Sequence, residues 1–282
     1  MTILGKARVH FDEASYLYGL AQCVSEKVAV TVYLTRKNLA QFRSWIRGRG
    51  VRDHDVSIAM YGVRHVVDLL GSEIYLLDEV YRERLYDRVA DFVPCADATV
   101  VDVGANVGIY SVLQARRGAR VYAFEPNPDC YRRLSRAVIE NALTSDVAVF
   151  NYAVGAATGM GTLKVPNNQT ALGSLVSVDG AAVTESAGVR ITSLDQILPA
   201  LGVEHVDLLK IDTEGAEVDV MHGAARTLGS TERIIVEYHS SRLRQQVGAL
   251  LGDHGFEQVL HVDTPATYLP HAGMIYAQRI AA

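Results

Sequence analysis

The stretch VVDVGANVGIYS, residues 100–111, joins a short apolar run to an acid at Asp102 and two glycines, Gly104 and Gly108. An apolar run that meets a glycine turn and then a helical pattern predicts the first strand–turn–helix unit of a parallel α/β sheet. In dinucleotide-binding turns of the form GxGxxG, the middle glycine lets the backbone approach a pyrophosphate. Asn106 stands at that position here, and Asp102 would repel phosphate while favouring a cation. The turn therefore predicts a nucleoside ligand that carries an amine or a sulfonium and no phosphate.

Apolar runs alternate with helical patterns from residue 98 to the end of the sequence. The five earlier runs are ATVVDVG, ARVYAFE, VAVFNYA, VDLLKID and RIIVEYH. An inserted hairpin and a short helix are expected within residues 161–198, before the fourth strand. The final two runs, residues 256–262 and 274–280, are joined without a helix, so they must pair antiparallel. The pattern is typical of an α/β fold in which helices cover both faces of a mostly parallel sheet.

Residues 1–85 differ from this pattern and are interpreted as an N-terminal appendage, helical with short strands, that could act as a substrate lid. Apolar and basic residues repeat at helical spacing over residues 36–47, which predicts an amphipathic helix. Residues 63–81 predict short strands that meet at a Gly-Ser turn, and residues 81–93 predict a helix. The main domain is expected at residues 86–282.

Composition limits the partners and the location of the chain. Apolar residues make up 49% of the 282, but no uninterrupted apolar run approaches the roughly 20 residues of a membrane helix. The opening residues MTILGKARVHFDEAS carry acids and a histidine where a secretory signal would be apolar, and the three cysteines form no CxxC. We therefore expect a cytoplasmic protein without a membrane partner. A net charge of −5 disfavours nucleic acid as a partner, and a homodimer is one option for the undetermined oligomeric state.

S-adenosylmethionine has the features that the glycine turn predicts. Its ribose needs an acceptor of two hydrogen bonds, and Glu125 stands at the end of the second expected strand. Its methionine carboxylate needs backbone N–H groups or a hydroxyl at the start of a helix, which residues 107–111 supply. Asp102 is placed to hold its ammonium group. Strand-end acids and glycines also occur as helix caps alone, so the assignment depends on Glu125 and the turn together.

Four motifs together resemble one known family: VVDVGANVGIYS, AFEPNP, LDQIL and LLKIDTEGAE. From about Glu79 to its C-terminus, the chain is similar to the FkbM-type S-adenosylmethionine-dependent methyltransferases of class I. The resemblance implies a Rossmann-like α/β fold with a seven-stranded sheet, an antiparallel last strand and, usually, methylation of a hydroxyl. It does not identify the acceptor. The motifs and the resemblance together give the expected cofactor-binding residues, which are Asp102, Gly104, Ala105, Asn106, Gly108, Ser111, Glu125, Pro126, Ala153 and Asp212.

Ionisable side chains stand at the ends of two expected strands. Lys210, Asp212 and Glu214 belong to the fourth strand and its end, and Glu237 and His239 belong to the fifth. Strand alternation places Lys210 with Asp212 on one face, and Glu237 with His239 on one face. These five residues are the candidate catalytic set. An alcohol acceptor needs a general base, for which His239 or Asp212 is suited.

Each candidate also has a purely structural interpretation. Lys210 could serve only to neutralise a neighbouring acid in the sheet. Glu214 and Glu217 could complement the dipole at the start of the next helix. His239 could be a histidine with its hydrogen bonds satisfied at the end of a strand. The sequence leaves these alternatives open.

We therefore expect an S-adenosylmethionine-dependent O-methyltransferase that acts, without a metal, on a hydroxyl of a small molecule, sugar or natural product. A magnesium ion held by Asp212, Glu237 and His239 is conceivable but not favoured, because spacing alone cannot show that they converge. The alternatives are a non-catalytic binding module with the same fold, and a methyltransferase that acts on a carboxylate or an RNA ribose. A nicotinamide-dependent reductase is disfavoured by the missing middle glycine.

Overall fold

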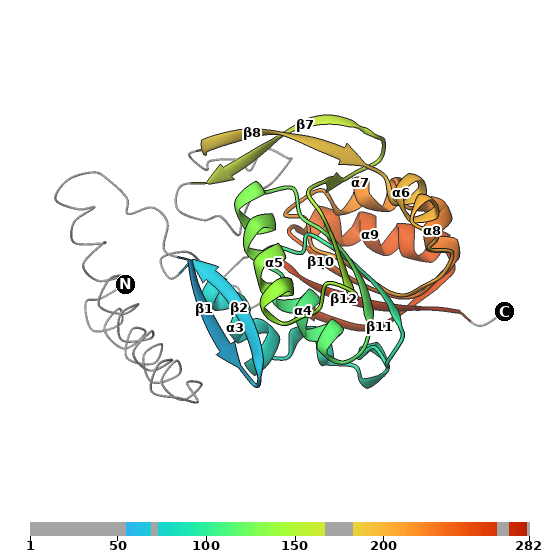
Figure 1. Ribbon diagram of the computed structural model, residues 1–282. Coiled ribbons are helices and arrows are strands. Elements are labelled where there is room, and N and C mark those ends of the chain that lie inside the picture. The colour runs from blue at the N-terminus through green and yellow to red at the C-terminus, as the bar shows by residue number, and fades with distance from the viewer. Residues whose placement is uncertain (1–54, 69–72, 167–182, 264–270, 281–282) are drawn as a thin grey trace, which may run out of the picture.

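The computed structural model describes residues 55–68, 73–166, 183–263 and 271–280. Its central sheet contains β3 (Thr99–Val103), β4 (Arg120–Phe124), β5 (Val147–Phe150), β9 (Val206–Ile211), β10 (Thr231–Tyr238), β11 (Phe256–Asp263) and β12 (Gly273–Arg279). The strand order is β11-β12-β10-β9-β3-β4-β5. Figure 1 labels β10, β11 and β12 of this sheet. Every pairing is parallel except the two made by β12, which runs antiparallel to β10 and to β11. The predicted seven-stranded sheet with an antiparallel last strand is confirmed.

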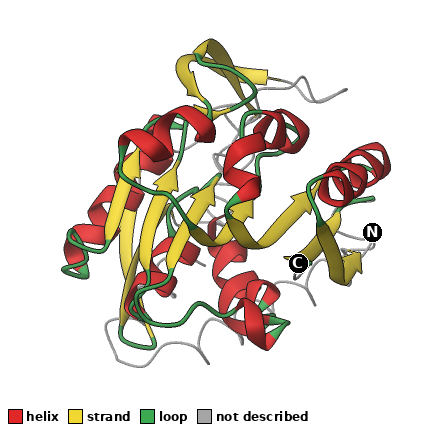
Figure 2. Ribbon diagram, turned by 90° about the vertical axis from the view of Figure 1, so that its right-hand side faces the viewer, coloured by secondary structure: helices red, strands yellow, loops and turns green. Residues whose placement is uncertain are grey.

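Helices cover both faces of this sheet, as Figure 2 shows from a second direction. They are α4 (Ile109–Arg116), α5 (Pro128–Glu140), α6 (Leu194–Ala200), α7 (Glu217–His222), α8 (Ala225–Gly229) and α9 (Ser241–Asp253). Neighbouring strand residues pack into different cores: Val100 packs with α4 and α5, whereas Val101 packs with the other four helices. Asp102 lies two residues beyond Val100 and therefore faces α4 and α5. In the described part of the chain, no helix has the length and apolar character needed to cross a membrane.

The predicted insertion before the fourth strand of the central sheet is also confirmed. It is a three-stranded sheet of β6 (Ala153–Val154), β7 (Gly159–Pro166) and β8 (Val183–Thr192), with β8 in the middle. β7 and β8 pair antiparallel, and the short helix α6 follows them. The hairpin lies at the top of Figure 1, and Leu163 and Val189 pack against Ala153 in a small core of their own.

The first of the strands predicted over residues 63–81 is confirmed, but residues 73–81 form helical turns where the second strand was predicted. The strand β2 (Val63–Asp68) pairs with β1 (Asp55–Met60), across a turn at Tyr61 and Gly62 whose φ angles are both positive. Helix α3 (Glu73–Leu77) and a π-helical turn (Asp78–Arg82) follow. The prediction of a second strand was wrong because Leu77 and Val80 stand at helical spacing and are buried in the core shared with α4 and α5. The predicted Gly-Ser turn and the predicted helix over 36–47 lie outside the described residues.

The helix predicted over residues 81–93 is also wrong. Arg84 has a φ of 50°, which ends the preceding helical turn, and Val89 is extended. A short 3₁₀ turn, Leu85–Asp87, lies between Arg84 and Val89, and a second one, Ala90–Phe92, follows Val89. Burial of one aromatic from each turn explains this path, because Phe92 packs edge-on against Tyr276 at 5.5 Å. The second buried aromatic, Tyr86, reaches the ends of the central strands.

The β1–β2 hairpin packs on α5 through buried charge. Arg133 is buried and its Nε lies 2.6 Å from Asp55 Oδ1, while its Nη1 lies 3.1 Å from Glu73 Oε1. Ser57 donates a hydrogen bond of 2.6 Å to Glu140 at the other end of the helix. Residues of β1 and β2 share one core cluster with α4 and α5. The division of the chain at residues 85 and 86 stays a prediction.

Candidate active site

The turn after β3 brings three segments together at the carboxyl end of the sheet. Gly104 and Gly108 have φ angles of 79° and 82°, and Asn106 has a φ of 53°. A Cβ atom on Gly104 would lie 1.7 Å from the backbone oxygen of Asp212, and one on Gly108 would lie 2.1 Å from Cδ1 of Leu134. The Asp212 N–H donates 3.0 Å to the Val103 carbonyl. The glycines therefore let the end of β9 and helix α5 approach the turn.

Asp102 and Lys210 form a buried ion pair beneath this turn. Lys210 Nζ lies 3.0 Å from Asp102 Oδ1 and 3.2 Å from the Gly104 carbonyl, to which it also donates. Ser111 donates a hydrogen bond of 2.5 Å to the other oxygen of Asp102. Burial lowers the pKa of Lys210, but the negative charges of Asp102 and Asp212 outweigh burial and raise it above the usual value. Lys210 therefore stays charged and is unsuited to accept a proton.

Glu125 lies directly after β4 and reaches the same turn. Its Oε2 accepts a hydrogen bond of 2.7 Å from the Asn106 N–H, and its Oε1 accepts one of 2.7 Å from the Asn127 N–H. Burial raises the pKa of Glu125 to about 7, although these two N–H donors act in the opposite direction. Asn127 also caps α5, with Pro128 at the first helical position, which fixes the chain just beyond Glu125.

Of the other expected cofactor-binding residues, Ala105 and Pro126 lie at the same edge of the sheet, whereas the side chain of Ala153 belongs to the inserted sheet. The Ala105 N–H donates 3.0 Å to the Phe124 carbonyl, which ties the glycine turn to the end of β4. The Pro126 carbonyl accepts a hydrogen bond of 3.1 Å from Asn151. Ala153 belongs to β6, and its side chain packs in the small core of the inserted sheet. The cofactor roles of these residues stay predictions.

His239 lies among carboxylates just beyond the end of β10. Its Nδ1 is 2.8 Å from Glu217 Oε1. Its Nε2 is 3.4 Å from Glu214 Oε2, 3.9 Å from Asp212 Oδ1 and 4.0 Å from Glu237 Oε1. The structure therefore brings three of the candidate catalytic residues, Asp212, Glu214 and Glu237, around the imidazole of a fourth, His239, and Lys210 lies 3.6 Å from Asp212 next to them.

These contacts decide the charge of the imidazole. Burial lowers the pKa of His239, but the hydrogen bond to Glu217 and the charges of the surrounding acids outweigh burial, so the pKa lies well above 6.5. Burial raises the pKa of Glu214 to about 7. Burial and the charge of Asp212 raise the pKa of Glu237 well above its usual value. The cluster therefore holds the ring protonated at neutral pH and releases the proton only at higher pH.

Tyr86 and Glu217 are candidate site residues that the sequence analysis did not identify. The buried Tyr86 hydroxyl lies 3.5 Å from Asp212 Oδ2 and 3.5 Å from Glu237 Oε2, and its ring centroid is 5.4 Å from Lys210 Nζ. Burial raises the pKa of Tyr86 well above 10.0, so the hydroxyl remains a donor. No sequence signal separates Tyr86 from neighbouring tyrosines. Glu217 stands in the LLKIDTEGAE motif, where its position at a helix start favoured a dipole role.

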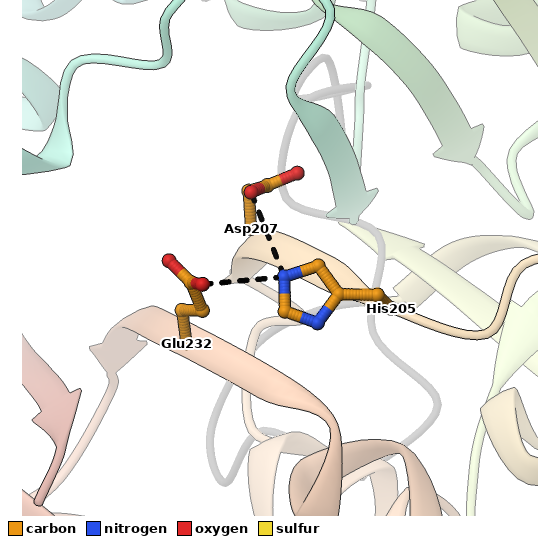
Figure 3. Close-up of side chains that lie close together, drawn as sticks. All are labelled: His205, Asp207 and Glu232. Atoms are coloured by element: carbon orange, nitrogen blue, oxygen red, sulfur yellow. Dashed lines mark ion pairs between the residues drawn. The ribbon is translucent and has the colours of Figure 1, made fainter. Parts of the chain in front are cut away.

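Among the described residues, two sets of three side chains place their possible ligand atoms close enough to share a metal ion. One ligand atom from each of Asp212, Glu214 and His239 lies within 4.8 Å of the other two, so Glu214 takes the place that the sequence analysis gave to Glu237. The second set is His205, Asp207 and Glu232 (Figure 3). It lies at the opposite, amino end of β9 and β10, where His205 and Glu232 are about half exposed. Carboxylates and imidazole suit several divalent ions, and the metal-free expectation stays a prediction.

The strand order, with a glycine turn and strand-end acids at its carboxyl edge, defines a Rossmann-like α/β fold of the methyltransferase type. A family model described as "Methyltransferase FkbM domain" matches residues 102–272. The chain belongs to the FkbM methyltransferase family, as its motifs predicted. A solved structure of a methyltransferase FkbM from Methylobacillus flagellatus shares the fold, with a TM-score of 0.50 and 18% identity over 70% of this chain and 50% of that one.

Curated relatives differ in how much of their length the chain spans. It is 30% identical to the AMB antimetabolite synthetase AmbE of Pseudomonas aeruginosa over 69% of this chain but only 11% of that protein. It is 27% identical to the hexuronic acid methyltransferase AglP of Haloferax volcanii, over 77% of this chain and 88% of that protein. It is 26% identical to the 2-O-methyltransferase NoeI of Sinorhizobium fredii, over 57% and 71% respectively.

Proposed function

We propose that the protein is an S-adenosylmethionine-dependent O-methyltransferase that acts on a hydroxyl of a small molecule, sugar or natural product. The observation that carries the proposal is the position of His239 and Asp212. Asp212 is bonded through its backbone to the strand that ends in the glycine turn, and its carboxylate lies 3.9 Å from His239 Nε2. A titratable ring thus stands next to the turn where the cofactor is expected, which is the arrangement that methylation of an alcohol requires.

The residues around the glycine turn fit S-adenosylmethionine. Glu125 uses one lone pair of each carboxylate oxygen for a backbone N–H, which leaves further lone pairs for the two ribose hydroxyls. The backbone from Gly104 to Gly108 and the start of α4 would hold the methionine carboxylate. Asp102 accepts hydrogen bonds from Ser111 and from Lys210, so in this proposal Asp102 and Ser111 fix the turn from beneath. The bound cofactor supplies an electrophilic methyl group.

The chain itself supplies the acid–base chemistry. In the proposed reaction the acceptor hydroxyl would lose its proton to Nε2 of a neutral His239 as its oxygen forms a bond to the methyl carbon, while the bond from that carbon to the cofactor sulfur would break and S-adenosylhomocysteine would leave. Asp212 orients the acceptor, and Lys210 keeps its charge and lies too deep to act as the base. Positioning supplies much of the acceleration in such an in-line displacement.

The charge of the site supports a hydroxyl acceptor over a carboxylate. At the alkaline pH where His239 becomes neutral, the Asp212 and Glu214 carboxylates beside its Nε2 would repel an anionic acceptor. RNA is disfavoured as an acceptor by the net charge of −5. The 2-O-methyltransferase of S. fredii supports a hydroxyl as the acceptor. The hexuronic acid methyltransferase of H. volcanii supports a sugar as the acceptor class, but a hexuronic acid carries a carboxylate as well as hydroxyls, so this relative does not favour either group.

One labelling experiment tests this proposal. The full chain is incubated with S-adenosylmethionine that carries a ¹³C methyl group and with pools of sugars, polyols and alcohol natural products, and products are detected by mass. We expect a labelled methyl ether, which survives mild alkali, whereas a methyl ester would be hydrolysed and would identify a carboxylate acceptor. Cofactor binding is measured on the same protein by calorimetry. Binding without transfer to any pool would favour a non-catalytic module, and no binding would reject the proposal.

A further inference from the structure

Glu217 makes the shortest contact to His239. It is the first residue of α7, and its side chain is fully buried. One oxygen, Oε1, lies 2.8 Å from His239 Nδ1 and also accepts a hydrogen bond of 2.9 Å from the Gly215 N–H. The backbone therefore fixes the very oxygen that meets the ring.

We infer that Glu217 is a positioning residue that holds the neutral ring of His239 as the tautomer with its proton on Nδ1. A carboxylate can only accept a hydrogen bond, so Nδ1 must be the donor in this pair. The lone pair of the neutral ring then stands on Nε2, which faces Asp212 and Glu214. Nε2 is the atom that the proposed function, on which this inference rests, uses to accept the acceptor proton.

A role in the helix dipole alone does not account for this arrangement. Asp219 stands in the same first turn of α7 and is exposed, as a residue that only complements the dipole can be. Glu217 is fully buried instead, and its second oxygen, Oε2, has no hydrogen-bond partner among the described residues. Burial of a carboxylate is costly unless a partner compensates for it. His239, which the surrounding charges hold protonated, is that partner.

The charged and titratable groups that face the ring come from four elements. They are Asp212 and Glu214 from the segment after β9, Glu217 from α7, Glu237 from β10 and, behind Asp212 and Glu237, Tyr86 from the 3₁₀ turn. Only Glu217 meets Nδ1, whereas the three other acids meet Nε2. Loss of the Glu217 charge should therefore lower the pKa of His239, but loss of a remote charge should not change it.

The first test needs no variant and no methyl acceptor. The side-chain ¹⁵N shifts of His239 in the full chain are followed by NMR from neutral to alkaline pH. We expect the ring to lose its proton above pH 6.5 and the neutral form to carry its proton on Nδ1. A neutral ring with its proton on Nε2 would overturn the inference, whatever the protein does with a methyl acceptor.

The second test compares two variants in the first turn of α7. Glu217→Gln keeps the shape of the side chain and removes its charge, and Asp219→Asn removes a charge from the same turn without a contact to His239. We expect Glu217→Gln to lower the pKa of His239, to move the acid limb of kcat to lower pH and to reduce kcat at least about tenfold at high pH, with KM for S-adenosylmethionine unchanged. Asp219→Asn should match the unaltered protein in all four measurements.

The outcomes separate this inference from the proposed function. If both variants behave alike, or if folded Glu217→Gln keeps the pKa of His239, Glu217 has only a structural role. If Glu217→Gln does not fold, the NMR measurement on the unaltered protein still decides. Altered titration of His239 without any methyl transfer would support the pairing of the two side chains and reject the proposed function.

Discussion

A Cβ atom on Gly104 would lie 1.7 Å from the backbone oxygen of Asp212. Gly104 directly follows β3, and Asp212 directly follows β9. Their backbones are therefore in close contact, although the two residues are far apart in sequence. The geometry of the glycine turn and the place of the Asp212 carboxylate are set by the same contact. A change at Gly104 should therefore affect folding and function together.

Gly104→Ala should destabilise the protein strongly, because alanine at a φ of 79° is strained and its methyl group would displace the end of β9. We expect a loss of more than about 3 kcal/mol in the free energy of unfolding, measured with urea. Gly202→Ala is the matched control, since Gly202 has a φ of 74° and nothing lies within 4 Å of its Cβ position. That variant should lose only about 1 to 2 kcal/mol. Equal losses in the two variants would mean that the contact to Asp212 is not tight.

Glu125→Ala should weaken the binding of S-adenosylmethionine and S-adenosylhomocysteine by roughly 1.5 to 3 kcal/mol, the range for hydrogen bonds to a charged group. Asp129→Ala serves as control, because Asp129 is an exposed acid in the first turn of α5, close in sequence but paired only with Arg132 at the surface. Calorimetry on both folded variants measures the effect. Unchanged affinity in Glu125→Ala would show that the end of β4 does not hold the ribose.

Turnover should rise with pH through the pKa of His239. The folded protein holds this pKa well above 6.5, so the neutral base is scarce at neutral pH and the acid limb of kcat should lie on the alkaline side of 6.5. His239→Ala should lower kcat by about 10² to 10⁴ and flatten that limb, while cofactor affinity stays unchanged. His205→Ala, in the exposed cluster at the far end of the sheet, should keep the full rate and the full limb. A His239→Ala variant that keeps its rate would make Asp212 the first choice for the base.

Chelation with EDTA should leave methyl transfer largely intact if the base belongs to the chain. The convergence of Asp212, Glu214 and His239 makes this a strict test, because their ligand atoms lie close enough to share an ion. Activity that is lost with EDTA and restored by Mg²⁺ or Mn²⁺ would recast these three residues as ligands. His205→Ala again serves as control, since any ion bound there should not affect the rate.

The sequence was sufficient for the central sheet because each of its strands carries its own signal. The continuous apolar runs predicted buried parallel strands, and the missing helix between the last two predicted β11 and β12 as an antiparallel pair, which is confirmed. Residues 73–93 were predicted wrongly, because their path depends on burial. Val80, Tyr86 and Phe92 are buried against parts of the chain that are distant in sequence, and no local pattern reports that burial.

The part of the candidate site that lies at the ends of strands could be predicted from the sequence. Alternation along β9 and β10 placed Asp212, Glu237 and His239 at one edge of the sheet, and in the structure His239 Nε2 lies 3.9 Å from Asp212 Oδ1 and 4.0 Å from Glu237 Oε1. Glu214 reaches Nε2 because its own backbone has a φ of 53°, a conformation that sequence does not reveal. The pairing of Glu217 with Nδ1 depends on the packing of α7 beside β10 and needed three dimensions to be seen.

The buried Arg133 limits where this protein can be truncated or fused to another protein. Arg133 lies within the matched family region, yet two of its ion-pair partners, Asp55 and Glu73, precede that region in the chain. A fragment that began at residue 102 would lack both of these carboxylates and would leave the guanidinium without them. The smallest transplantable module is thus longer than the signature that identifies it. A chimera that swaps this region into a multidomain synthetase needs its junction upstream of Asp55.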